Sequence, residues 1–99
     1  MKKNLILTKE IEEKVISFLK ECGAKKISIF GSYVRGEATP DSDLDIIVEL
    51  EENISLLDIV GFEMDLSEQL GIKVELLTEK SISPYMIDDV LAEAKVIYS

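Results

Sequence analysis

Apolar residues recur at helical spacing in two long stretches of the chain, and each stretch ends at a glycine. The first begins after Thr8, which has the position of an N-cap, and stops at Gly23. The second runs from Leu56 to Gly71. The spacing predicts two amphipathic helices. Their expected buried faces are Ile11, Val15, Phe18 and Cys22 in the first and Ile59, Phe62, Leu66 and Leu70 in the second.

Shorter apolar runs between these helices predict strands at 27–30, 44–50 and 72–77. Residues 32–36 are expected to form a brief helical turn, and 38–42 a loop interrupted by Pro40. Ser83 followed by Pro84 is typical of a helix start. The buried face expected for this last helix is Ile87, Val90, Leu91 and Ala94. Residues 95–98 could extend it or form a fourth strand, and we expect the strand.

The alternation of helices and strands predicts an α/β fold, in which a small mixed β-sheet is flanked by helices. A chain of 99 residues, 46% of them hydrophobic, is expected to form a single domain over residues 1–99. Tyr85 and Met86, at the start of the last helix, could belong to the core or lie exposed as contact residues.

Charge and composition exclude several functional classes. The net charge of −9 argues against direct binding of nucleic acid, which depends on Lys and Arg. The absence of histidine excludes imidazole chemistry and histidine-ligated zinc. A single cysteine, Cys22, cannot form an internal disulfide and is compatible with a reducing cytoplasm. The apolar run 5–7 is too short for a membrane span or a signal sequence, so no membrane association is expected.

Two carboxylates lie at the start of the strand expected at 44–50. Asp43 and Asp45 are two residues apart and should project from one face, with their backbones about 6–7 Å apart. Like charges this close disfavour each other's ionisation unless a cation lies between them, and Mg²⁺ prefers oxygen ligands. The alternative is a pair of solvent-facing residues at a strand entrance, which leaves the neighbouring Gly-Ser turn unexplained.

Gly31 and Ser32 form that turn, directly after the strand expected at 27–30. Backbone N–H groups and a hydroxyl at such a turn can bind a phosphate, although Gly-Ser turns are also common without a ligand. Arg35 could clamp a nucleotide phosphate. It could equally be a surface residue, or a structural partner of Asp41 or Asp43. Phosphate donors beside metal-binding carboxylates indicate phosphoryl or nucleotidyl transfer.

This segment resembles the signature of the DNA polymerase beta superfamily of nucleotidyltransferases. Gly31-Ser32 is followed by ten residues, 33–42, and then by Asp43-Leu44-Asp45. The short chain, Arg35-Gly36 and Ser42-Asp43 are similar to the minimal nucleotidyltransferase branch, whose members are commonly antitoxins paired with a HEPN-domain toxin. The resemblance extends over nearly the whole chain and implies a polymerase-beta-like fold.

The resemblance also implies a mechanism. AMP would pass from ATP to a protein hydroxyl, such as a tyrosine of the HEPN toxin, with two Mg²⁺ ions held by Asp43, Asp45 and Glu75. Gly31 and Ser32 would bind the β- and γ-phosphates. The third carboxylate is usually Asp in this family, and Glu75 is one methylene longer. Glu75 could otherwise be a solvated residue of an edge strand.

A binding protein is the principal alternative, in which the chain neutralises its partner by complex formation alone. Transfer to a small molecule such as an aminoglycoside fits less well, because relatives with that activity carry an additional domain. Surplus acidic residues, among them Glu49, Glu51 and Glu52, could be a solvated face or part of a surface for a basic partner. Homo-oligomers and hetero-oligomers both remain open.

Overall fold

The computed structural model describes residues 7–99, and its centre is a four-stranded sheet of order β3-β2-β1-β4. β1 pairs antiparallel with both β2 and β4, whereas β2 and β3 are parallel. The elements in chain order are α1 (Lys9–Glu21), β1 (Ala24–Phe30), α2 (Ser32–Arg35), β2 (Leu44–Leu50), α3 (Leu56–Leu70), β3 (Val74–Leu77), a 3-10 turn (Glu79–Ser81), α4 (Ile87–Glu93) and β4 (Lys95–Tyr98). The expected small mixed sheet flanked by helices is confirmed.

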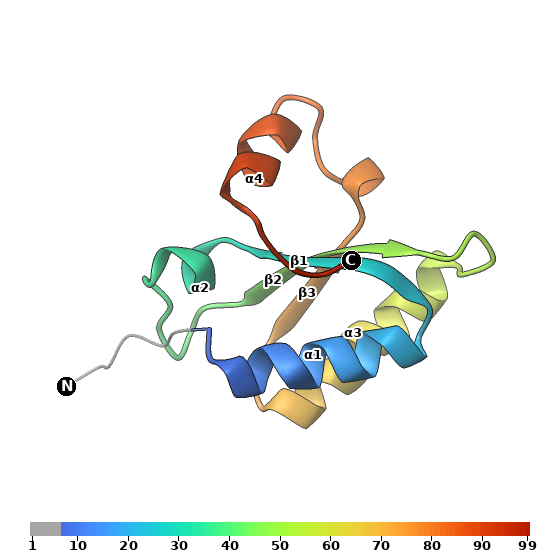
Figure 1. Cartoon of the computed structure of the whole chain (residues 1–99), viewed down its shortest axis with the longest axis horizontal. Coiled ribbons are helices and arrows are strands. Elements are labelled where there is room, and N and C mark those ends of the chain that lie inside the picture. Colours follow the sequence, from blue (N-terminus) through green and yellow to red (C-terminus); the bar gives the residue numbers. More distant parts are fainter. Residues whose placement is uncertain (1–6) are drawn as a thin grey trace.

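Helices α1 and α3 lie side by side on one face of the sheet, whereas α4 lies on the other side and α2 lies where β1 ends (Figure 1). The core fills the space between the sheet and the α1–α3 layer. Alternate residues of β2, namely Leu44, Ile46 and Val48, point into this core and are fully or almost fully buried. The residues between them, including Asp45, therefore belong to the opposite face.

The two long helices form as the sequence predicts. The Thr8 hydroxyl accepts a hydrogen bond from the Ile11 N–H and caps α1. Ser55 and Asp58 form a reciprocal capping box at the start of α3, and Gly71 ends that helix in the left-handed conformation. The buried face of α1 is rotated from the expectation. Its fully buried residues are Val15 and Leu19, whereas Phe18 and Cys22 are only half-buried.

Three of the predicted bounds were wrong. β1 begins at Ala24 rather than at 27, because the main chain pairs with β2 regardless of the charged side chains of Lys25 and Lys26. β3 begins at Val74 rather than at 72. α4 begins at Ile87 rather than at Pro84, because the Ser83 carbonyl accepts hydrogen bonds from the N–H groups of Met86 and Ile87 and closes a turn.

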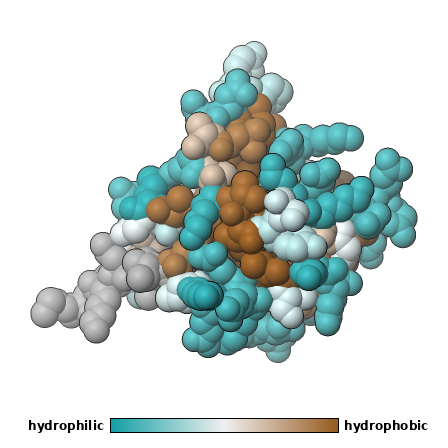
Figure 2. Space-filling view, viewed as in Figure 1, coloured by the Kyte–Doolittle hydropathy of each residue, from teal (hydrophilic) through white to brown (hydrophobic). Residues whose placement is uncertain are grey.

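Helix α4 also lacks the buried face that its sequence suggests. None of its residues is buried, and Leu91 is 41% exposed. Figure 2 shows apolar side chains gathered on the viewed face between α1 and α4, in the region that β4 crosses. Tyr85 and Met86 are exposed, which excludes them from the core. The fourth strand is confirmed as β4.

The outer edge of β3 is closed by side chains. The N–H groups of Val74 and Leu76 donate to the Ser67 hydroxyl and the Glu63 carboxylate of α3, each at 2.8 Å. The next outward N–H, that of Thr78, donates to the Ser81 hydroxyl. Each of these donors, which an additional strand would need, already has a partner.

No helix in the described part of the chain is long and apolar enough to cross a membrane. The short apolar run at 5–7 lies outside the described residues except for Leu7.

Candidate functional site

Three adjacent strands bring the candidate residues together at one end of the sheet. Asp45, the second residue of β2, is paired in register with Phe30 on β1 and with Glu75 on β3. Gly31 directly follows Phe30, where the chain leaves β1 and enters α2. Because β2 and β3 are parallel and β1 runs against them, the end of β1 lies at the same end of the sheet as the beginnings of the other two strands. Asp45 therefore lies between the turn at Gly31 and Glu75, although up to 44 positions separate these residues in the chain.

Both the backbone conformation at position 31 and the lack of room for a side chain there require glycine. The φ of 81° and ψ of −153° of Gly31 lie in a region that is essentially restricted to glycine. A Cβ added there would lie 2.5 Å from the Oδ2 of Asp45. The carboxylate thus packs directly against the turn. The adjacent Ser32, half-buried, begins α2, so the predicted brief helical turn is confirmed.

Asp45 carries the strongest electrostatic perturbation of the site. The pKa of its carboxyl is raised from 3.8 to about 7, first by burial and further by the hydrogen bond and charge of Glu75 and the charge of Asp43. The guanidinium of Arg35 opposes them and lowers this pKa. The charges of Asp43 and Glu75 therefore both act on Asp45, and a cation would favour the ionised forms of these carboxyl groups.

Asp43 lies just before β2 and is held in an ion pair with Lys73, at 3.8 Å between Oδ2 and Nζ. Both residues line an open pocket of about 420 Å³ that follows β3 and also contains Glu75 and Glu63. Lys73 has no counterpart in the sequence prediction. It faces Asp43 because its carbonyl accepts a hydrogen bond from the Leu44 N–H, which aligns the starts of the two strands.

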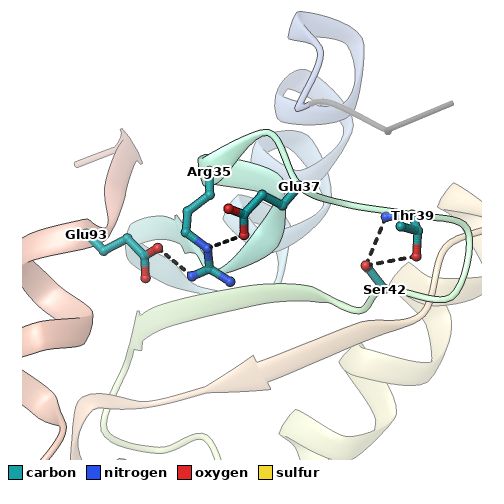
Figure 3. Close-up of polar contacts among 5 residues, drawn as sticks. All are labelled: Arg35, Glu37, Thr39, Ser42 and Glu93. Atoms are coloured by element: carbon teal, nitrogen blue, oxygen red, sulfur yellow. Dashed lines mark hydrogen bonds and ion pairs between the residues drawn. The ribbon is translucent and has the colours of Figure 1, made fainter.

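Arg35 forms its ion pairs with two glutamates, whereas one of the three sequence-based alternatives expected Asp41 or Asp43 as its partner. Its Nε donates to Glu37 at 3.0 Å and its Nη1 donates to Glu93 of α4 at 2.5 Å (Figure 3). The second contact connects α2 with α4 across 58 positions of sequence, and no local pattern could have predicted it.

The loop before β2 is closed by the Ser42 hydroxyl, which accepts a hydrogen bond from the Thr39 N–H (Figure 3).

The chemistry of these donors fits a hard divalent cation, because Asp43, Asp45 and Glu75 offer only oxygen atoms. The side-chain arrangement is less complete. Within residues 7–99, no group of three or more His, Cys, Asp or Glu side chains is already arranged to hold a metal ion. Asp43 is instead paired with Lys73, and Asp45 is hydrogen-bonded to Glu75.

The chain thus has a mixed sheet flanked by helices, with a Gly-Ser turn after β1 and acidic residues at the starts of β2 and β3, and this fold is that of the nucleotidyltransferases. Comparison with known proteins agrees, since the nucleotidyltransferase domain family matches residues 9–97. The chain belongs to this family. Within it, the relatives and structural neighbours identify the minimal nucleotidyltransferases of toxin–antitoxin pairs as the branch it resembles.

Two relatives span almost the same length as this chain. The protein adenylyltransferase MntA of Thermococcus cleftensis is 40% identical over 95% of this chain and 97% of its own. A Methanocaldococcus jannaschii protein assigned as a protein adenylyltransferase is 48% identical over 86% of this chain and 91% of its own. A toxin–antitoxin crystal structure with AMP-PNP contains a chain of the same fold, with a TM-score of 0.80 and 26% identity over 89% of this chain and 73% of that one.

The raised pKa of Asp45 predicts a pH-dependent stability in metal-free protein. Because the folded state binds this proton more tightly than the unfolded state, the carboxyl stabilises the fold below pH 4 and this contribution is lost as the pH rises through about 7. We expect the melting temperature of the wild type, relative to that of Asp45→Asn, to fall between pH 5 and pH 8. The difference between the two proteins cancels other titrating groups. A difference that stays constant over this range would contradict the prediction.

Proposed function

We propose that the chain transfers AMP from ATP to a hydroxyl group of a partner toxin. The acceptor we propose is a tyrosine of a HEPN-domain toxin, and the cofactor is Mg²⁺, with two ions. The observation that carries this proposal is the packing of Asp45 against both Gly31 and Glu75, which unites a phosphate-binding turn with crowded carboxylates. A reducing cytoplasm is the proposed location, consistent with the free thiol of Cys22.

The proposed roles follow the positions of the side chains. The acceptor oxygen attacks the α-phosphorus of ATP, the bond to the β-phosphate oxygen breaks, and pyrophosphate leaves. Asp43, Asp45 and Glu75 would hold the metal, which when bound stabilises the charge on the attacking and leaving oxygens. Gly31 and Ser32 bind the β- and γ-phosphates through N–H groups and the Ser32 hydroxyl. The proton of the acceptor hydroxyl passes to solvent or to a carboxylate of the site.

Arg35 is proposed to bind phosphate after leaving Glu37 or Glu93. Its charge already acts on Asp45, which indicates that the guanidinium lies near the carboxylates. Both of its ion pairs are at least partly exposed to solvent, and ion pairs that water can reach are weak. A triphosphate, with several charges, competes well against them. The net charge of −9 argues against a nucleic-acid substrate.

A non-catalytic antitoxin is the second candidate function, and two observations favour it. In the described residues the carboxylates are not already arranged as a metal-binding group, and Glu75 is longer than the aspartate usual at this place. A chain of this kind would bind its toxin, and the nucleotide site would be vestigial or regulatory.

The two functions are separated by incubating the purified chain with α-labelled ATP, Mg²⁺ and the HEPN-domain protein of the same organism. We expect label on the HEPN protein and release of pyrophosphate. A stable complex that forms without label, over a range of Mg²⁺ concentrations, would instead identify a binding protein.

Glu75 variants test the third carboxylate in the same assay. Glu75→Gln is expected to reduce the transfer rate by about 10²-fold or more, because a misplaced catalytic group already has an effect of this order. Glu75→Asp should retain transfer or increase it, since Asp is the family's usual residue. Equal transfer rates for the wild type and Glu75→Gln would exclude Glu75 from the site. Circular dichroism of both variants controls for folding.

A further inference from the structure

Helix α3 carries apolar residues on two sides, and the core covers only one of them. Ile59, Phe62, Leu66 and Leu70 pack into the core. A second set, which we call the outer stripe, consists of Leu56, Leu57, Val60 and Met64. Each of these residues exposes between 52% and 84% of its surface to solvent. Four large apolar side chains on two turns of one helix are a contiguous surface of the kind that marks an interaction site.

Helix α3, which carries the outer stripe, is capped at both ends. The Ser55 hydroxyl accepts from the Asp58 N–H at 3.2 Å, and the Asp58 carboxylate accepts from the Ser55 N–H at 3.0 Å. At the other end, the Gly71 N–H donates to the Ser67 carbonyl. A stripe on such a helix needs little ordering when a partner binds, which favours affinity.

The segment that carries the outer stripe has charged residues of a single sign. Residues 51–72 contain no Lys or Arg, and their acidic residues are Glu51, Glu52, Asp58, Glu63, Asp65 and Glu68. Two copies of this surface would oppose carboxylates to carboxylates, and like charges facing one another across an interface are strongly unfavourable. Anionic membranes and nucleic acids are disfavoured for the same reason. A partner with an apolar centre and a rim of Lys and Arg is the complementary surface.

The outer stripe borders the candidate site. Val60 and Met64 each lie three residues before a side chain that reaches the β3 edge, because Glu63 binds the Leu76 N–H and Ser67 binds the Val74 N–H. Glu63 also lines the open pocket along β3, which contains Asp43 and Glu75. A protein seated on the stripe would therefore lie beside this pocket and close to the carboxylates.

We propose that the outer stripe of α3 is the docking surface for the acceptor protein, which contacts it through an apolar patch rimmed with Lys and Arg. This inference rests on the proposed function for the identity of the partner as a HEPN-domain toxin. Docking there positions the acceptor hydroxyl along the β3 pocket, so that one interface provides both binding and access to the site.

The test is the affinity of the full chain for the HEPN-domain protein of the same organism, measured by calorimetry without ATP. Leu57→Glu places a carboxylate in the stripe at a position that is 84% exposed, so folding should be unaffected. We expect the affinity to fall by about 30-fold or more, as for a hot-spot residue. The matched control is Gln69→Glu, which adds the same charge to an exposed residue of α3 outside the stripe. Its affinity should stay within about threefold of the wild type, as expected for a charge added at the rim of an interface or beyond it.

A second variant tests the sign of the partner's charge. Glu68→Lys is expected to slow association and to reduce the dependence of the association rate on salt, because rim charges act mainly on the encounter. Faster association by Glu68→Lys would show an acidic partner and overturn the proposal.

Binding and transfer are read separately, which keeps the two proposals distinguishable. Loss of binding by Leu57→Glu but not by Gln69→Glu supports the docking surface, with or without transfer of label by the wild type. Label transfer together with equal affinities of wild type and Leu57→Glu overturns the docking surface and leaves the proposed function intact. Failure of the wild type to bind the HEPN protein, or dimerisation of the chain alone that Leu57→Glu abolishes, overturns the docking surface as well.

Discussion

Asp45→Asn is expected to lower the rate of AMP transfer by at least about 10³-fold, the largest effect of any single substitution that preserves the fold. Asn has the shape of Asp but lacks the charge, and the loss of several kcal/mol of electrostatic stabilisation corresponds to a factor of this size. The folded protein should not suffer, because the substitution removes a carboxylate that is crowded by Glu75 and Asp43. Labelled transfer from ATP to the HEPN protein measures the effect.

Glu49→Gln is the matched control for Asp45→Asn. Glu49 belongs to the same strand and is four positions further along it, so that it lies on the same face of the sheet, but it is exposed and lies away from Gly31 and Glu75. Its transfer rate should equal that of the wild type within about twofold, as surface substitutions usually change little. An Asp45→Asn protein that retains a tenth or more of the wild-type rate would contradict the predicted loss, and a rate equal to that of Glu49→Gln would show that the reaction does not depend on this carboxylate.

Gly31→Ala is expected to destabilise the protein and to abolish transfer together. A side chain in this backbone conformation costs about 1–3 kcal/mol of unfolding free energy. For a domain of this size, the melting temperature should fall by roughly 4–8 °C per kcal/mol. The added Cβ would also meet Oδ2 of Asp45 at 2.5 Å, and the carboxylate has to move from its place beside Glu75. Thermal unfolding and labelled transfer measure the two effects.

Gly36→Ala separates the backbone effect from the displacement of Asp45. Gly36 also has a positive φ, of 74°, but an added Cβ would have no atom within 4 Å. This variant should lose about 1 kcal/mol of stability and keep its transfer rate. If Gly31→Ala transferred as fast as Gly36→Ala, the contact between the turn and Asp45 would have no part in the reaction.

The site was predictable to the extent that it depends on local spacing and strand pairing. The ten residues between Ser32 and Asp43 are enough for the chain to leave β1, form α2 and return as β2, so the turn and the carboxylates meet. Glu75 was assigned through the resemblance to the family, whose third carboxylate lies on the neighbouring strand, since the sequence alone also allowed a solvated residue of an edge strand.

Other contacts depend on tertiary structure and left no pattern in the sequence. The pairing of Arg35 with Glu93 requires α4 to return toward α2, and the ion pair of Asp43 with Lys73 requires the exact register of β2 and β3. The last helix was predicted to begin too early, because Ser83 and Pro84 suit a turn as well as a helix start. Its apolar residues suggested burial, but α4 covers too little of the sheet to bury any of them.

The closed edge of β3 limits how other proteins can recognise this flank. Recognition through an added strand uses main-chain bonds that every peptide can form, and it therefore discriminates weakly between sequences apart from its side-chain pockets. Because Ser67, Glu63 and Ser81 occupy the donors of this edge, a protein that approaches it has to be selected by its side chains. Selectivity of that kind can change by single substitutions while the sheet stays intact, which would allow related chains in one cell to diverge toward different partners.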